Sequence, residues 1–355
     1  MRSFYINSVS TITAQPEDFL TSKEVLELQG NILRASARNY KELIKPMMLR
    51  RMSKAVKMGI FSAVQALSRS GIESPDAILV GTGHGCMQDT EKFMQQIEES
   101  EEQLLTPTSF IQSTHNTVSG QIALFLKCTG YNMTYTQNSV SFESCLLDAQ
   151  MQFELDPEIQ NLIVGAVDET SEKFTGFQKL DGQIKEEKIT NTDILNSNTS
   201  GTIISESSAF FSISRDKSSG SLAVCSAVKI LNDFQPSEIE EKVIQFLQEN
   251  ELTSENLDAI VLGNNGDNRF DVYYHNLQQG LLRNVPQLAY KSLAGDNNSI
   301  SAIGFALGIS ILQHQEIPKK FRLNSKSASI FNRILVYNQY LGRNHGFILL
   351  ESLEI

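Results

Sequence analysis

The sequence has few cysteines and no long apolar segment. Its four cysteines are scattered and form no C-x-x-C pair: Cys86, Cys128, Cys145 and Cys225. This spacing argues against a zinc site or a disulfide framework and fits a reducing, cytoplasmic environment. No run of eighteen apolar residues occurs, so we expect no membrane-spanning helix.

Positive charge is scarce as well. The 355 residues include 30 lysines and arginines against 41 aspartates and glutamates, a net charge of −11, which disfavours nucleic acid as a partner. One segment departs from this balance, because residues 34–57 contain eight basic residues and a single acidic one, Glu42. Such a segment is either a solvated helix face or a surface that attracts an acidic macromolecule.

Several catalytic signatures are also missing. No G-x-S-x-G elbow occurs, which argues against the triad of an α/β-hydrolase. The glycines at residues 81–85 lack the spacing of a phosphate-binding loop and indicate a tight turn. We therefore expect neither a cofactor nor a metal ion.

Apolar periodicity predicts strands and helices that alternate along the whole chain, which is typical of an α/β fold. A polar stretch at residues 182–201 is expected to be a surface loop, and residues 300–312 are apolar almost all round, which predicts a helix buried between layers. The expected helices are 52–67, 118–127, 142–153, 236–250 and 300–312, and the expected strands are 4–9, 77–81, 132–136, 162–167, 202–214, 222–230, 257–263, 333–337 and 346–350.

Six segments, taken in order, carry the motifs of one enzyme family. They are Leu49–Met52 (LRRM), Ile78–Gly83 (ILVGTG), Thr117–Ile122 (TVSGQI), Leu162–Ala166 (LIVGA), Lys291–Gly295 (KSLAG) and Gly304–Pro318, an apolar helix ending in Ile-Pro. Their order over nearly the whole chain resembles the β-ketoacyl synthases, which are condensing enzymes. The resemblance implies a thiolase-like fold with five layers, α-β-α-β-α, two similar halves at residues 1–215 and 216–355, and a dimer.

A seventh segment, Asn132–Ser141 (NMTYTQNSVS), resembles the strand and helix start that present the family's nucleophilic cysteine, and Ser139 stands at the cysteine's position. A thiolate at a helix start accepts the acyl group because the helix dipole lowers the thiol pKa. Serine is a weaker nucleophile without a base beside it. Cys145 fits less well, since counting from it places the strand at 162–166 about five residues too early. We expect Cys145 to be a small buried helix residue.

The other catalytic positions of the family are also changed. The resemblance places Gly263 and Asp296 where the family has its two histidines, which help to decarboxylate the extender and stabilise the enolate. Lys291 is retained, and we expect it to be structural, paired with a nearby aspartate. His345 lies in a glycine-rich turn that has been eroded, where it is either an ordinary loop residue or a substitute base for Ser139. The aspartates considered as partners of Lys291 are Asp296, Asp267 and Asp271.

These changes favour a non-catalytic role. The chain resembles a chain-length factor, which pairs with a true ketosynthase in polyketide, aryl-polyene or fatty-acid-like biosynthesis; residues 106–115 and the helix after Ser139 would then line the tunnel or the interface. A homodimer stays open, as does an acyltransferase or condensing enzyme that uses Ser139 as acyl acceptor. The resemblance also implies docking of an acidic acyl carrier protein on basic residues, and a structural role for Glu206. The basic candidates are Arg50, Arg51, Lys54 and Lys57.

Overall fold

Ten strands supply the frame of the molecule, in two sets of five along the chain. The computed structural model describes residues 2–101, 103 and 105–354. The first set is β1 (Phe4–Ile12), β3 (Ala77–Gly81), β4 (Tyr131–Tyr135), β5 (Asn161–Asp168) and β7 (Ser207–Ser214). The second set is β8 (Ala223–Asn232), β9 (Ala259–Leu262), β10 (Gln287–Ala289), β11 (Arg333–Tyr340) and β12 (Asn344–Glu351). Outside this frame, β2 (Ile32–Leu33) pairs with β6 (Ile204–Ser205).

The two sets repeat the same strand order. Across the sheet, the first set runs β1-β7-β5-β3-β4 and the second runs β8-β12-β11-β9-β10. Each set therefore places its first, fifth, fourth, second and third strands side by side in that sequence. The sets meet where Phe4–Ile6 of β1 pairs antiparallel with Ala223–Cys225 of β8, which leaves β4 at one end of the ten-stranded order and β10 at the other.

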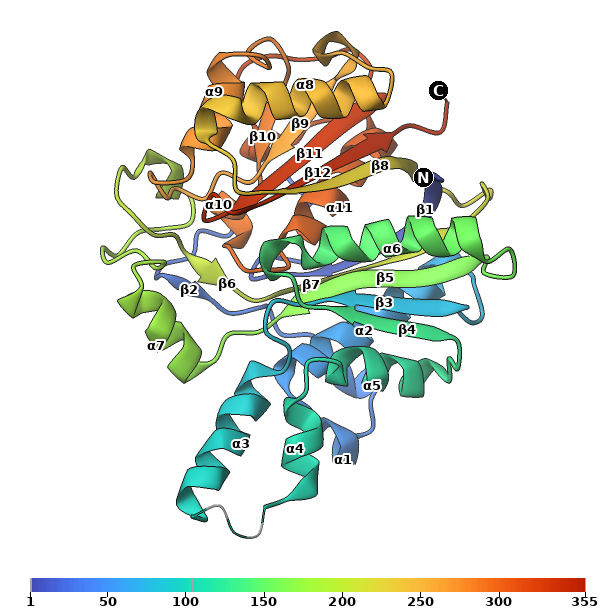
Figure 1. The fold of residues 1–355 in the computed structure, drawn as a ribbon, viewed down its shortest axis with the longest axis vertical. Coiled ribbons are helices and arrows are strands. Elements are labelled where there is room, and N and C mark those ends of the chain that lie inside the picture. The colour runs from blue at the N-terminus through green and yellow to red at the C-terminus, as the bar shows by residue number, and fades with distance from the viewer. Residues whose placement is uncertain (1, 102, 104, 355) are drawn as a thin grey trace.

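Helices cover the two halves of the sheet in three layers (Figure 1). One outer layer holds α2 (Lys54–Ser70) and α5 (Thr117–Leu126), and the other holds α8 (Ile239–Glu249) and α9 (Val272–Gln279). Between the two halves lie α6 (Ser141–Leu155), α10 (Lys291–Ala294) and α11 (Ser301–His314). This is the α-β-α-β-α arrangement of the thiolase-like fold, and it confirms the fold class expected from the sequence.

The middle layer is the core of the molecule. Phe305 of α11 packs edge-on against Phe142 of α6 and Phe211 of β7, with ring centroids 5.4 and 4.9 Å apart. Nearly every residue of α11 is buried, because both halves of the sheet pack against it. Its uniformly apolar sequence, which predicted a helix between layers, follows from this position.

The remaining helices were not expected from the sequence. They are α1 (Pro46–Leu49), α3 (Met87–Glu99), α4 (Pro107–Ser113), α7 (Glu172–Leu180), and the short α9 and α10 already placed. In Figure 1, α3 and α4 project from the lower end of the molecule. Within the described part of the chain, no helix combines the length and the apolar character that crossing a membrane requires.

Candidate functional site

Ser139 lies in a single turn of 3-10 helix, Asn138–Val140, that leads into α6. The turn is pinned to the end of β3, because the Ser141 hydroxyl donates to the Thr82 carbonyl oxygen at 3.0 Å. Gly81 makes this approach possible: a Cβ there would lie 2.8 Å from the Ser141 carbonyl carbon. The strand, turn and helix expected around Ser139 are therefore present.

The Ser139 side chain has no base beside it. The residue is 1% exposed, and within the described residues its hydroxyl has no hydrogen-bonding partner. Its backbone carbonyl oxygen accepts from Asn338 Nδ2 at 3.2 Å. A hydroxyl with an ordinary pKa needs a base within hydrogen-bonding reach to act as a nucleophile.

Gly263, where the sequence resemblance placed the first family histidine, is surrounded by side chains. It directly follows β9, and its N–H donates to the Tyr337 carbonyl oxygen at 3.1 Å. A Cβ on this residue would lie 3.1 Å from Lys291 Cε and 3.0 Å from Asn338 Oδ1. It would lie closer still to the Tyr274 hydroxyl. The space for a larger side chain is therefore already filled.

Asp296, where the sequence resemblance placed the second histidine, forms an ion pair with Lys291. Lys291 Nζ lies 3.0 Å from Asp296 Oδ1, and the Lys291 side chain is fully buried. The second carboxylate oxygen of Asp296 accepts from Asn265 Nδ2 at 2.6 Å. Lys291 thus has one of the aspartate partners expected from the sequence. The cavity beside Asp296 has a volume of about 30 Å³, which holds about one water molecule but no acyl chain.

Glu143 is a buried carboxylate of this site that sequence reasoning missed. It lies in the first turn of α6, and Ser301 Oγ donates to its Oε2 at 3.0 Å. Its Oε1 has no hydrogen-bonding partner in the described part of the chain. Burial raises the pKa of Glu143 to about 7. An acidic residue two positions before Cys145, which was expected to be buried in the same helix, was the signal that could have identified it.

The structure does not bring His345 to Ser139. His345 lies in β12 rather than in a turn, and both ring nitrogens have partners, the Tyr337 hydroxyl at 3.0 Å and the Gly342 carbonyl oxygen at 3.2 Å. Its ring stacks on Phe234 at 3.9 Å. The next residue, Gly346, faces Glu143, and successive side chains of a strand point to opposite faces. His345 therefore points away from Ser139, and burial lowers its pKa to about 4.

Cys145 and Glu206 have the structural roles expected of them, whereas Asp271, considered as a partner of Lys291, binds backbone N–H groups instead. Cys145 is fully buried in α6, and burial raises the pKa of its thiol well above the usual value. The Asp271 carboxylate accepts from the N–H groups of Asn265 and Gly266 at 3.1 and 2.9 Å. Glu206 is buried beneath β7 and accepts from the Ala35 N–H at 2.9 Å.

The four basic candidates for carrier docking differ in availability. Arg50 and Arg51 are exposed, and no ion pair involves either within the described residues. Lys54 instead forms an ion pair with the buried Glu206, so its charge is engaged inside the protein. Lys57 is half-buried. Only the two arginines are presented to solvent.

Residues 106–115, expected at a tunnel or an interface, form α4 and its flanks. Phe110 and Ile111 of α4 are 58% and 61% exposed. Ile111 borders a groove of about 250 Å³ together with Met48 and Arg51. In the described residues, no group of three or more histidine, cysteine, aspartate or glutamate side chains is arranged to hold a metal ion.

Comparison with known proteins agrees with this fold. Residues 29–184 match the family model of the β-ketoacyl synthase N-terminal domain. The structure of the ishigamide ketosynthase/chain length factor superposes with a TM-score of 0.80 at 13% identity, over 99% of each chain. The ketosynthase ApeO in complex with its chain length factor ApeC, from Xenorhabdus doucetiae, gives 0.75 at 16% identity, over 99% of this chain and 98% of that chain.

A third similar structure includes a carrier protein. It is AntDE:AntF, a type II polyketide synthase acyl carrier protein in complex with its ketosynthase, with a TM-score of 0.74 at 13% identity, over 99% of this chain and 100% of that chain. No curated protein sequence matches this chain. The chain therefore has the ketosynthase fold that the sequence resemblance implied, and residues 29–184 match the model of the family's N-terminal domain.

Proposed function

We propose that this chain is a chain-length-factor-type partner of a catalytic ketosynthase, unable to condense acyl groups by itself. The pathway is polyketide, aryl-polyene or fatty-acid-like biosynthesis on an acyl carrier protein. Among the similar structures, one is described as a ketosynthase/chain length factor and another as a ketosynthase with its chain length factor. That pairing is the precedent for this proposal.

The main support for this proposal is that neighbouring side chains leave no space for a larger side chain at Gly263. Condensation needs groups that remove carbon dioxide from the extender and hold the resulting enolate. Here Tyr274 and Lys291 occupy the space where a first histidine would project, and the Lys291–Asp296 ion pair occupies the second position. A carboxylate repels an enolate, and the lysine charge is already neutralised by that carboxylate.

The partner surface that we propose is the free edge of β4. This strand ends the sheet, its sequence Tyr-Asn-Met-Thr-Tyr has no charge and no proline, and Asn132 and Met133 are exposed. An uncharged edge strand offers unpaired N–H and C=O groups to a second chain. Because β4 leads into the turn that carries Ser139, a ketosynthase that pairs there would lie next to the altered site.

Association with a ketosynthase tests this interface. A tagged form of the chain should retain a co-expressed ketosynthase through affinity purification and size exclusion. Met133→Lys, on the edge strand, should weaken that complex at least about tenfold, because a buried unpaired lysine costs several kcal/mol. Leu180→Lys is the matched control, since Leu180 is 86% exposed on α7, away from β4. A stable homodimer that ignores every ketosynthase offered would refute the proposal.

Arg50 and Arg51 are the proposed contacts for the acidic carrier protein. Arg50→Glu/Arg51→Glu should reduce crosslinking of the complex to the carrier while leaving assembly with the ketosynthase intact. Lys54→Glu should destabilise the fold instead, because Lys54 neutralises Glu206. Unchanged crosslinking in the double arginine variant would place the carrier elsewhere.

A second function is favoured by one observation. Ser139 lies in the 3-10 turn before α6, Glu143 lies in the first turn of α6, and each has a buried oxygen without a partner in the described region. Glu143 is the candidate base for acyl transfer to Ser139, although the two side chains would have to move into hydrogen-bonding reach of each other. Intact mass after incubation with acyl-CoA and acyl carrier donors distinguishes the two functions. An adduct lost in Ser139→Ala would support the acyltransferase.

A further inference from the structure

The loop at residues 182–202 is anchored far more firmly than its polar sequence indicates. Residues 182–201 were expected to be a surface loop, yet Lys185 and Asn191 in it are buried. Asn191 accepts from the Leu28 N–H at 2.7 Å and donates to the Leu26 and Leu293 carbonyl oxygens at 3.1 and 3.2 Å. One side of the loop is thereby fixed to the body of the protein.

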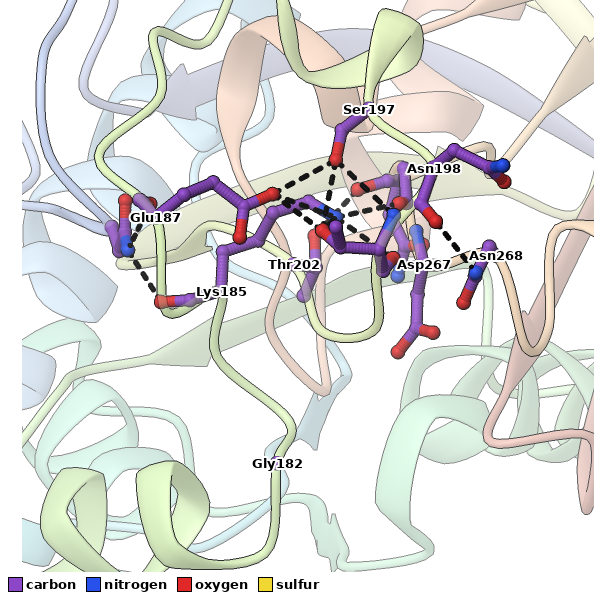
Figure 2. A network of polar contacts seen from close by, with 12 residues as sticks. Gly182, Lys185, Glu187, Ser197, Asn198, Thr202, Asp267 and Asn268 are labelled. Atoms are coloured by element: carbon purple, nitrogen blue, oxygen red, sulfur yellow. Dashed lines mark hydrogen bonds and ion pairs between the residues drawn. The ribbon is translucent and has the colours of Figure 1, made fainter.

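The other side of the loop is fixed to residues 264–269, the segment that follows the altered position Gly263. Thr202 Oγ1 donates to the Asn265 carbonyl oxygen at 2.7 Å. Asn268 Nδ2 donates to the Asn198 carbonyl oxygen at 2.8 Å, and Arg269 Nη2 donates to the Gly182 carbonyl oxygen at 2.8 Å. Figure 2 shows Asn268 reaching Asn198 across the gap between the two segments.

Lys185 lies at the centre of this junction. Its ammonium donates to the Thr199 carbonyl oxygen at 3.0 Å, to the Thr199 hydroxyl at 2.9 Å and to the Gly266 carbonyl oxygen at 2.9 Å. An ammonium has three N–H donors, so all of them are used, and they join both ends of the loop to the segment below. In Figure 2 the Lys185, Glu187 and Ser197 side chains converge at this point.

The charge of Lys185 is balanced by Glu187. Glu187 Oε1 lies 3.9 Å from Lys185 Nζ and accepts from Ser197 Oγ at 3.0 Å and from the Thr199 hydroxyl. Burial lowers the pKa of Lys185, and the Glu187 carboxylate acts in the opposite direction. Removing the lysine would leave the carbonyl oxygen of the buried Gly266 without this donor, which costs stability, and would release the exposed Thr199 from the segment below.

The loop borders the small cavity at the altered site. Gln183 and Thr202, at its two ends, line the cavity of about 30 Å³ together with Asn265 and Asp296. Asn265 in turn donates to Asp296, which pairs with Lys291. The loop therefore holds Asn265 in place, and Asn265 positions the Lys291–Asp296 ion pair.

We propose that residues 182–202 form a locked lid over the altered site, and that Lys185 is the positioning residue that keeps it closed. The lid separates the Lys291–Asp296 pair from solvent on this face, so a carrier-bound acyl group does not enter this subunit here. The proposal rests on the contacts of the loop and not on the absence of catalysis, so either can fail without the other.

Hydrogen exchange on the protein tests whether Lys185 keeps residues 182–202 closed. Lys185→Met keeps the length of the side chain and removes the charge and the three donors. Amides of residues 186–202 and 264–271 should exchange at least about tenfold faster than in the wild type. Lys188→Met is the matched control, because Lys188 is an exposed lysine of the same loop, and it should leave exchange unchanged. Equal exchange in the two variants would overturn the proposal.

Two further measurements keep the outcome clear. If Lys185→Met does not fold, Thr199→Val keeps the side-chain shape and removes the hydroxyl that bonds Lys185, Glu187 and Ser197. A severalfold increase in exchange confined to the two segments is expected, and no increase would refute the proposal. Intact mass of Lys185→Met after incubation with acyl-CoA is recorded separately. Faster exchange without an adduct supports both proposals. Faster exchange with an adduct on Ser139 supports the lid and refutes the non-catalytic role.

Discussion

Adding one methyl group at Gly263 tests whether the position of the first family histidine is filled. In Gly263→Ala, the new Cβ would lie 3.0 Å from Asn338 Oδ1, 3.1 Å from Lys291 Cε and closer to the Tyr274 hydroxyl. These neighbours are held in place: the Tyr274 hydroxyl accepts from the Gln339 N–H at 2.9 Å, and Lys291 forms its ion pair at 3.0 Å. Overpacking of a filled core costs about 1–3 kcal/mol, and with held neighbours we expect about 2–3 kcal/mol.

The assay is urea unfolding followed by circular dichroism, with Gly120→Ala as the matched control. A Cβ on Gly120, in α5, would meet nothing within 4 Å, so that change should be neutral or stabilising by about 0.5–1 kcal/mol. In a Tyr274→Phe background, the alanine at 263 should cost about 1 kcal/mol less, since the closest contact is gone. The reasoning is wrong if Gly263→Ala costs no more than Gly120→Ala, or if Tyr274→Phe gives no relief.

Three further predictions concern buried titratable groups. Burial alone would raise the pKa of Glu206, but hydrogen bonds from Lys54 and the Ala35 N–H bring the pKa below the ordinary 4.5. The free energy of unfolding of Glu206→Gln at pH 7 should therefore be about 1–3 kcal/mol lower than that of the wild type in chemical unfolding. This difference should shrink as the pH falls below 4.5. Burial raises the pKa of Glu143 from 4.5 to about 7, so the wild type loses stability as the pH rises between these values. Between pH 4 and pH 8, the free energy of unfolding of Glu143→Gln should therefore rise by up to about 3 kcal/mol relative to that of the wild type. Burial raises the pKa of the thiols of Cys86, Cys145 and Cys225. Maleimide at pH 7 should therefore modify one cysteine, the half-buried Cys128. An intact mass with more than one adduct on the folded protein would contradict this prediction.

The sequence predicted the fold well where local pattern and tertiary packing agree. The strand at 77–81 was placed at its observed bounds, and Gly71 ends α2 in the left-handed conformation that glycine favours, with φ of 71°. The helices α3, α4 and α7 were missed, and none of the three contains a buried residue. Each of these helices is short or strongly polar, so its sequence resembles that of a surface loop.

The candidate site was predictable by position but not by orientation. Gly263 lies beside Lys291, which pairs with Asp296, and Asn338 beside Gly263 donates to the Ser139 carbonyl oxygen. His345 was misplaced because the expected turn is a hairpin: β11 runs to Tyr340 and β12 starts at Asn344. Strand register then fixes which face each side chain takes, and register depends on pairing partners far away in the sequence. The burial of Lys185 depends in the same way on acceptors supplied by Gly266.

The two edge strands of the ten-stranded sheet differ in whether another segment covers them, and this difference bears on how many subunits could pair edge to edge. At β10 the outer edge is occupied, because Leu288 forms a bridge with Arg322 and the Leu323 N–H donates to the Gln287 carbonyl oxygen at 2.8 Å. Within the described residues, β4 has no such cover. A sheet open at both ends can add copies without limit, as a filament does. If subunits pair at β4, as we propose, the pairing uses the uncovered edge of the ten-stranded sheet in the described residues, and the covered edge at β10 stops further growth by edge pairing.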